Sequence, residues 1–185
     1  LNNLDCGELI LAGDIIDFIR VPTFTKQTAQ LFQTIANLNK DNKKIIYIST
    51  DYVYEGLNGN YKETDAIKPF TKYGWSKLGG ECAVKMLDNH LILRMGMNKK
   101  PFPHPKALKD MIKSLIYVED AAKVTLKLLG ENGVINVGGK AQSVYDFVKE
   151  ENPNVEPIYL KDISDVNMAT DCSMNIKKML EVIDD

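Results

Sequence analysis

The sequence predicts an α/β protein built on a doubly wound parallel sheet. Short apolar runs typical of buried strands alternate with segments of helical periodicity over most of the 185 residues, and this alternation favours parallel strands joined by crossover helices. With 44% hydrophobic residues, the chain can bury one sizeable core. We therefore expect a single domain over residues 1–185, with a sheet core over 8–95 and a mixed part over 96–185 that holds further sheet elements and a small lobe.

The first part of the chain supplies expected elements in the order strand, helix, strand, helix. Residues 8–12 are a short apolar run closed by a glycine, the pattern of a buried strand that ends in a turn. Leucine and isoleucine recur at helical spacing over residues 25–39, where a threonine can cap the helix. Residues 44–49 are rich in β-branched and aromatic side chains and give the strongest strand signal. After a polar loop that contains glycines, helical periodicity resumes over residues 73–88.

The middle of the chain combines strand patterns with an irregular segment. Residues 90–94 indicate another buried strand, opened by His90, and residues 114–118 indicate a short one. The segment 95–113 between them contains three prolines. We expect this segment to cover a cleft, in a part of the chain after about Gly96 that mixes short elements with irregular loops.

The last third alternates helices and strands in the same way. It contains expected helices over residues 119–129, 144–150 and 175–183 and expected strands over residues 134–137 and 155–160. Two glycines end the first of these helices. Ser143 and Ser173 are placed to cap the other two, since a serine hydroxyl can accept a hydrogen bond from a free amide of the first helical turn.

Composition excludes several classes of function. The 23 basic and 25 acidic residues give a net charge of -2, too balanced for a nucleic-acid partner. No apolar run approaches the roughly 18 to 20 residues that cross a bilayer, so we expect a cytoplasmic protein without membrane contact. Cys6, Cys82 and Cys172 are widely spaced and odd in number, which indicates reduced thiols. With only His90 and His104 available and no ligand spacing around either, no metal site is expected.

The chemistry-bearing residues cluster after the strand at 44–49. Thr50 and Asp51 follow that strand directly, and ligand clefts of parallel sheets lie at this end of the strands. Tyr73 and Lys77 stand four apart at the head of the next helix, so their side chains share one face. A nearby cation favours the phenolate form of a tyrosine. Such a tyrosine can exchange a proton with a sugar hydroxyl or carbonyl while Thr50 hydrogen-bonds the same oxygen.

The order of these residues carries a family resemblance. The run Ser-Thr-Asp-Tyr-Val-Tyr at 49–54 is followed by Gly56, by Tyr61-x-Glu63-x-Asp65, by Pro69, and by Tyr-Gly-x-Ser-Lys-x-x-Gly-Glu at 73–81. This series resembles the extended short-chain dehydrogenase/reductases, and within them the dTDP-4-dehydrorhamnose reductase branch. The resemblance covers roughly residues 8 to 150 and continues through segments 93–94, 116–122 and 133–139.

The resemblance implies a Rossmann-like fold and a set of site residues. Tyr73 corresponds to the proton donor of the family, and Lys77 to the lysine that holds the nicotinamide ribose and acts on the tyrosine. Thr50 corresponds to the threonine that binds the reacting oxygen. Asp51 lies beside these three as a proton relay. A small substrate lobe is expected in the C-terminal part.

The implied cofactor is NADP or NAD. Ala12 and Gly13 fall where the next strand end of the family contacts it. No Gly-x-x-Gly-x-x-Gly or Gly-x-Gly-x-x-Gly turn, which would hold the pyrophosphate, is present in the sequence. We therefore expect the sheet to be incomplete at its N-terminal side, because the family places about two βα units ahead of Glu8, and we expect the chain alone to bind NAD(P)H poorly.

The resemblance favours a reductase that acts on a nucleotide-activated 4-keto-6-deoxy sugar, as in dTDP-rhamnose biosynthesis. Ser49-Thr50-Asp51-Tyr52 resembles the reductase branch, whereas dehydratases more often resemble Thr-Asp-Glu at that place. An epimerase or dehydratase of the same family remains an alternative, as does a truncated, non-catalytic member that binds or regulates. The helices at 25–39 and 73–88 resemble the pair through which family members form homodimers, so a homodimer is expected.

Overall fold

The computed structural model describes residues 8–11, 37, 43–163 and 168–184. Among them, five strands form a sheet in the order β1-β2-β3-β6, and β7 also pairs with β3. The strands are β1 (Glu8–Leu11), β2 (Lys44–Thr50), β3 (His90–Asn98), β6 (Leu115–Tyr117) and β7 (Gly133–Val137). All pairs in this sheet are parallel, so the predicted parallel α/β class is confirmed.

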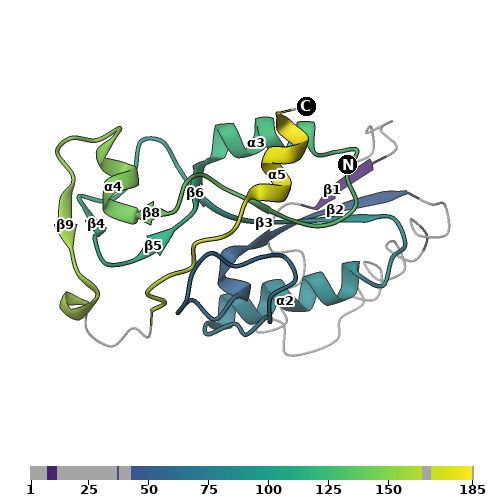
Figure 1. The fold of residues 1–185 in the computed structure, drawn as a ribbon, viewed down its shortest axis with the longest axis horizontal. Coiled ribbons are helices and arrows are strands. Elements are labelled where there is room, and N and C mark those ends of the chain that lie inside the picture. The colour runs from purple at the N-terminus through teal and green to yellow at the C-terminus, as the bar shows by residue number, and fades with distance from the viewer. Residues whose placement is uncertain (1–7, 12–36, 38–42, 164–167, 185) are drawn as a thin grey trace.

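Helices cover both faces of this sheet. Helix α2 (Lys72–Val84) lies on one face, and α3 (Val118–Lys127) and α5 (Lys177–Ile183) lie on the other (Figure 1). The alternation of side chains along β2 divides the core, because successive strand residues point to opposite faces. Ile45 and Tyr47 pack with Val84 of α2, and Ile46 packs in the cluster that contains residues of α3 and α5.

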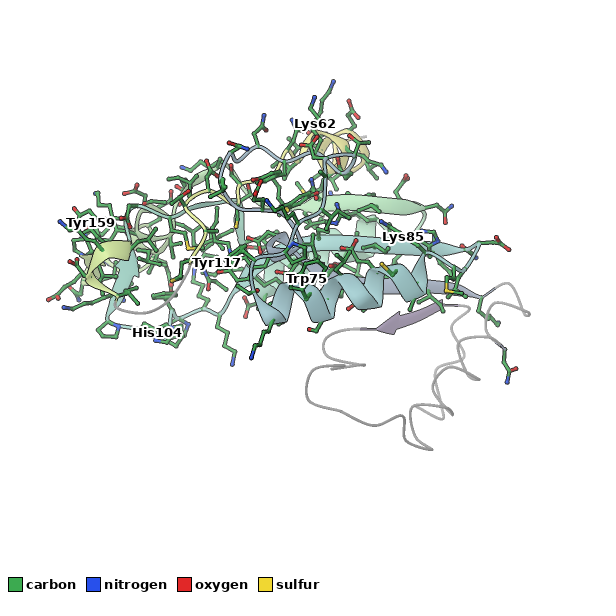
Figure 2. All side chains as sticks on the ribbon, turned by 90° about the horizontal axis from the view of Figure 1, so that it is seen from below. Lys62, Trp75, Lys85, His104, Tyr117 and Tyr159 are labelled. Carbon is green, nitrogen blue, oxygen red and sulfur yellow. The ribbon has the colours of Figure 1, made fainter. Side chains whose placement is uncertain are left out.

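A small lobe extends from one end of the sheet (Figure 1). It consists of β4 (Lys106–Leu108), β5 (Ile112–Lys113), β8 (Gln142–Ser143), α4 (Val144–Lys149), β9 (Glu156–Ile158) and the 3₁₀ helix η2 (Leu160–Asp162). Strand β4 pairs with β9, and β5 pairs with β8. The lobe's hydrophobic cluster of Ala107, Phe147, Val148 and Val155 includes Leu115 of β6 and therefore joins the lobe to the sheet. Figure 2 shows His104 and Tyr159 at this end of the molecule and Lys85 toward the other.

Most expected elements appear within a few residues of their predicted bounds. The strand that His90 opens continues to Asn98 instead of ending at residue 94, because residues 96–98 pair with β6. The segment 95–113 contains the end of β3 and the strands β4 and β5, in line with the expected mixture of short elements and loops. These strands are short and pair with distant segments, so local periodicity does not reveal them. Within the described ranges, no helix has the length and apolarity to cross a membrane.

The predicted helix caps had mixed outcomes. Ser143 caps α4 as expected, since its Oγ accepts a hydrogen bond from the amide of Asp146 at 2.9 Å. Ser173 does not cap α5, which begins at Lys177. The Ser173 hydroxyl instead accepts a hydrogen bond from the amide of Asn60 at 2.9 Å. The helix expected over 25–39 lies outside the described residues, except for Asn37, which is helical.

Candidate active site

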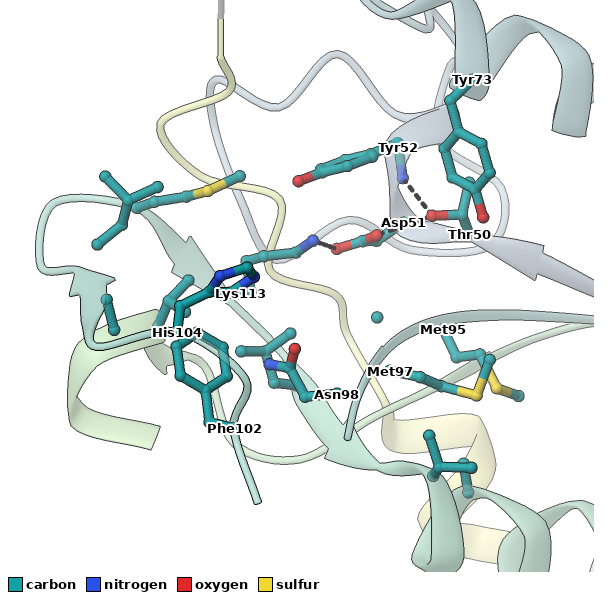
Figure 3. Close-up of a pocket in the computed structure, with 18 of the residues that line it drawn as sticks. Thr50, Asp51, Tyr52, Tyr73, Met95, Met97, Asn98, Phe102, His104 and Lys113 are labelled. Atoms are coloured by element: carbon teal, nitrogen blue, oxygen red, sulfur yellow. Dashed lines mark hydrogen bonds and ion pairs between the residues drawn. The ribbon is translucent and has the colours of Figure 1, made fainter. Parts of the chain in front are cut away.

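A cavity of about 1150 Å³ opens at the carboxyl ends of β2 and β3, where the sheet meets the small lobe. Apolar side chains make up most of its wall. The polar side chains that line it beside the strand ends include Thr50, Asp51, Tyr52, Tyr73, Lys77 and Lys113, and most of these six are drawn in Figure 3. Parallel α/β sheets bind their ligands at this end of the strands, so the cavity is the candidate active site.

Thr50 and Asp51 reach the cavity because β2 ends at its edge. Thr50 is the last residue of β2, and Asp51 opens the 3₁₀ helix η1 (Asp51–Val53). Thr50 Oγ1 accepts a hydrogen bond from the amide of Tyr52 at 3.3 Å. It donates one to Asp51 Oδ1 at 3.0 Å. The Thr50 hydroxyl therefore has a defined orientation, with its proton directed at Asp51.

Tyr73 and Lys77 reach the same cavity from the first turns of α2. Thr71 caps this helix by accepting a hydrogen bond from the amide of Gly74 at 2.9 Å. Gly74 lies against η1, and a Cβ at this position would stand 2.3 Å from the carbonyl oxygen of Tyr52. The absence of a side chain thus lets the start of α2 approach the loop that carries Thr50.

The two side chains differ in exposure. Tyr73 is 48% exposed, and Figure 3 shows its ring beside Thr50. Lys77 is only 2% exposed, and its Nζ lies 4.8 Å from the centroid of the Tyr47 ring. The cavity is lined by both residues. A half-exposed phenol can meet a ligand directly, while the buried ammonium contributes a positive charge to the same cavity.

A buried ion pair anchors α2 to the sheet one turn beyond Lys77. Glu81 Oε1 and Oε2 accept hydrogen bonds from Arg94 Nε at 2.9 Å and Nη2 at 2.7 Å. Ser49 Oγ donates to the same carboxylate at 2.6 Å. Arg94 Nη1 also donates to the Tyr54 hydroxyl at 2.9 Å. Burial opposes the charge of Arg94, but its hydrogen bonds to Glu81 outweigh this effect and raise the pKa of the guanidinium.

A second buried ion pair lies inside the cavity and joins the lobe to the sheet core. Lys113 Nζ in β5 is 2.8 Å from Asp51 Oδ2 and 3.9 Å from the centroid of the Tyr52 ring. Figure 3 shows the lysine reaching from the lobe to the carboxylate. Burial opposes the charge of Lys113, but the Asp51 carboxylate and Tyr52 raise the pKa of the ammonium. Burial also raises the pKa of the Tyr52 phenol.

Sequence reasoning anticipated part of this arrangement. The structure brings the predicted residues Thr50, Asp51, Tyr73 and Lys77 to one cavity. Ala12 and Gly13, which the resemblance assigned to cofactor contacts, lie outside the described residues. Lys113 was missed. Its position could have revealed it, because Lys113 stands near the start of a mostly apolar run at 112–118. A lysine in such a run indicates a buried charge that needs a partner.

In the part of the chain that the structure describes, no three His, Cys, Asp or Glu side chains gather as a possible metal site. Cys82 and Cys172 are free thiols, as expected, and Cys6 lies outside the described residues. Burial raises the pKa of the Cys172 thiol, so this cysteine is a weak nucleophile.

The family comparison agrees with the predicted resemblance. Residues 19–98, which include Thr50, Tyr73 and Lys77, match the model of the RmlD substrate binding domain. Solved structures with the same fold include dTDP-4-dehydrorhamnose reductases. The predicted resemblance to the extended short-chain dehydrogenase/reductases, within them the dTDP-4-dehydrorhamnose reductase branch, is confirmed.

Two relatives illustrate the range of this similarity. One is a dTDP-4-dehydrorhamnose reductase of Aggregatibacter actinomycetemcomitans, 51% identical over 43 residues, which are 23% of this chain and 15% of that protein. The other is methionine adenosyltransferase 2 subunit beta of Bos taurus, 51% identical over 47 residues, which are 25% of this chain and 14% of that protein. The similarity therefore covers only a small share of either relative.

Solved structures extend the similarity over most of the chain. A hypothetical dTDP-4-dehydrorhamnose reductase from Sulfolobus tokodaii superimposes with a TM-score of 0.72 at 25% identity, over 94% of this chain and 72% of that one. The dTDP-4-dehydrorhamnose reductase of Bacillus anthracis, solved in complex with NADP, superimposes with a TM-score of 0.65 at 24% identity. That match covers 80% of this chain and 62% of the other.

Proposed function

We propose that this protein acts as an NAD(P)-dependent reductase of a nucleotide-activated 4-keto-6-deoxy sugar. The observation that carries the proposal is the meeting of Thr50, Tyr73 and Lys77, from β2 and α2, at one cavity between the sheet and the lobe. The match to the RmlD substrate binding domain supports a sugar-nucleotide substrate.

The cavity suits the nicotinamide end of the cofactor. Ile48, Met95 and Ala121 contribute apolar surface to the cavity that Lys77 also lines, where a flat ring and its ribose could be held. The sequence contains no Gly-rich turn for the pyrophosphate of the cofactor. The cavity is therefore matched here to the nicotinamide and its ribose alone. When bound, the nicotinamide would supply the hydride that reduces the sugar carbonyl carbon.

The side chains of the cavity would handle the proton. Tyr73 donates its phenolic proton to the carbonyl oxygen, which becomes a hydroxyl, and the Lys77 ammonium favours the resulting phenolate. A carbonyl oxygen can only accept hydrogen bonds, so the Thr50 hydroxyl, which donates to Asp51 Oδ1 in this structure, would turn its proton toward the substrate oxygen. Thr50 and Tyr73 would then both donate to the oxygen that gains negative charge as the hydride adds.

The test is turnover of a dTDP-linked 4-keto-6-deoxyhexose, followed by NADPH and NADH oxidation. Tyr73→Phe keeps the ring but removes the proton donor, so turnover should fall by roughly 100-fold or more. Tyr145→Phe, a matched change in α4 where Lys109 and Lys149 stack on the ring, should leave it unchanged. Equal turnover of Tyr73→Phe and the unchanged protein, with folding verified by circular dichroism, would reject the assignment.

A second function is a non-catalytic subunit that binds a partner protein. The match to the beta subunit of methionine adenosyltransferase 2 favours it. The same assay separates the two candidates, because a binding subunit shows no oxidation of NAD(P)H with any sugar nucleotide. A pull-down of methionine adenosyltransferase by this protein, unchanged by Tyr73→Phe, would then support the subunit function.

A further inference from the structure

Lys113 brings a hydrogen-bond donor from the small lobe to the cavity, beside the residues of the proposed reaction. Its Nζ lies 2.8 Å from Asp51 Oδ2 and 3.9 Å from the centroid of the Tyr52 ring. Asp51 Oδ1, the other oxygen of the same carboxylate, accepts the Thr50 proton at 3.0 Å. A single carboxylate group therefore separates the Lys113 ammonium from the Thr50 hydroxyl (Figure 3).

Burial of this ion pair is weak evidence for a stabilising role. Asp51 is 1% exposed and Lys113 is 8% exposed, and removing two charges from water commonly costs as much as their attraction returns. Both residues line the cavity. Their position therefore favours a role toward a ligand of that cavity.

The pair is uncovered on the side of β3 because Gly96 has no side chain. Gly96 lines the cavity, and a Cβ at this position would stand 3.0 Å from Asp51 Oδ2 and 3.3 Å from Leu115 Cδ2. A side chain there would press on the carboxylate that holds Lys113. With glycine, strand β3 passes the pair without covering it.

The chemistry of the pair defines the ligand group that it can bind. An ammonium carries three donors and no acceptor, so Lys113 can donate to a ligand oxygen while it keeps its contact with Asp51. Because the Asp51 carboxylate balances the charge of Lys113, the pair as a whole is neutral. Asp51 would repel a carboxylate or phosphate placed beside it. A neutral oxygen, such as that of a sugar hydroxyl, suits the pair better.

Two other hydroxyls of the cavity wall are already committed as donors within the protein. Ser49 Oγ donates to Glu81 Oε1 at 2.6 Å, and Thr125 Oγ1 donates to the carbonyl oxygen of Ala121 at 2.7 Å. Lys113 differs from them because one contact with a carboxylate oxygen does not exhaust the three donors of an ammonium.

We propose that Lys113 is a specificity-determining residue, which donates a hydrogen bond to the hydroxyl on the sugar carbon next to the carbonyl. This inference rests on the proposed function, in which Thr50 and Tyr73 hold the carbonyl oxygen. Oxygens on neighbouring carbons of a hexose lie close together, so a ring held in this way can place the adjacent hydroxyl within reach of Lys113. The lobe then selects a hydroxy ketone as well as covering the substrate.

The experiment compares two substrates, the dTDP-linked 4-keto-6-deoxyhexose and its analogue that lacks the hydroxyl at carbon 3. The ratio of kcat/KM for the two sugars is measured for each protein at one pH. Lys113→Met should lower kcat/KM for the hydroxylated sugar by about tenfold or more, because a hydrogen bond from a charged group is lost. It should change kcat/KM for the analogue much less.

The ratio separates recognition of the hydroxyl from a merely structural role of Lys113. A variant that only disturbed the fold or displaced Thr50 would lower kcat/KM for both sugars alike. The hydroxyl also alters the reactivity of the neighbouring carbonyl, but it does so by the same factor in every variant. That effect therefore cancels when the ratios are compared.

Lys109→Met is the matched control. Lys109 lies in the same lobe, 3.9 Å from an Asp146 carboxylate oxygen and 4.6 Å from the centroid of the Tyr145 ring, so it reproduces the Lys–Asp–Tyr set outside the cavity. Its ratio should equal that of the unchanged protein. If Lys113→Met does not fold, the double variant with Asp51→Asn removes both charges, a change that buried pairs often tolerate, and it should show the same loss of preference.

An equal preference for the hydroxylated sugar in the unchanged protein and in Lys113→Met would overturn the inference. The double variant decides in the same way where the single variant does not fold. Turnover that Tyr73→Phe abolishes would leave the reductase function standing in either case.

Calorimetric titration with the same two sugars makes the comparison through Kd if the unchanged protein shows no turnover. A preference in binding that Lys113→Met removes would then support the contact with the hydroxyl and reject the reductase function. Equal binding of the two sugars, or no binding of either, would reject both.

Discussion

The buried pair between Glu81 and Arg94 offers a stringent test of what holds α2 in place. Arg94→Met removes the guanidinium and leaves the Glu81 carboxylate, which is 0% exposed, with Ser49 Oγ at 2.6 Å and with Lys85 Nζ, 3.8 Å away. Breaking a buried pair by removing one partner typically costs about 3–5 kcal/mol. We expect a loss in that range in the free energy of unfolding.

Urea unfolding followed by circular dichroism measures this loss. Adding Glu81→Gln to Arg94→Met removes the uncompensated charge and should recover part of the stability, because a neutral amide is cheaper to bury than a carboxylate. Lys106→Met is the control, since its partner Glu156 lies 3.7 Å away on the surface and exposed pairs contribute about 0–1 kcal/mol. A loss below about 1 kcal/mol in Arg94→Met would refute the reasoning, because it would place that buried pair in the range of exposed ones.

Two further predictions concern the site and the helix beneath it. Thr50→Val keeps the β-branched shape but removes the hydroxyl, so kcat for the sugar nucleotide should fall by about tenfold with little change in KM, as steady-state kinetics would show. The second variant, Gly80→Ala, places a Cβ 2.1 Å from the hydroxyl oxygen of Tyr47. The Tyr47 side chain is buried between α2 and β2. Overpacking should destabilise the protein by about 1–3 kcal/mol, more than the roughly 0.5–1 kcal/mol that alanine gains over glycine in a helix. We therefore expect Gly80→Ala to lower the thermal unfolding temperature, and a temperature above that of the unchanged protein would contradict this.

Local patterns were sufficient for the elements whose residues carry their own signal. The continuous apolar run at 45–48 predicts β2 because both faces of that strand are buried. Ser143 predicts the start of α4 because its cap bond spans only three residues. Ser173 misled for the same reason. Its hydroxyl was available for a local cap, but it binds the amide of Asn60, a choice that depends on where the loop after η1 lies.

The sequence by itself determined the meeting of Thr50, Tyr73 and Lys77. The end of a parallel strand opens on the ligand edge of the sheet, and residues four apart share one helix face, so each placement follows from a single element. The tertiary structure alone decided the partners of these residues. Arg94 and Lys113 reach Glu81 and Asp51 across elements that lie far apart in the chain, and such pairs form only when the strands and the lobe pack, because periodicity reports which side of an element is buried and not which charge it will meet.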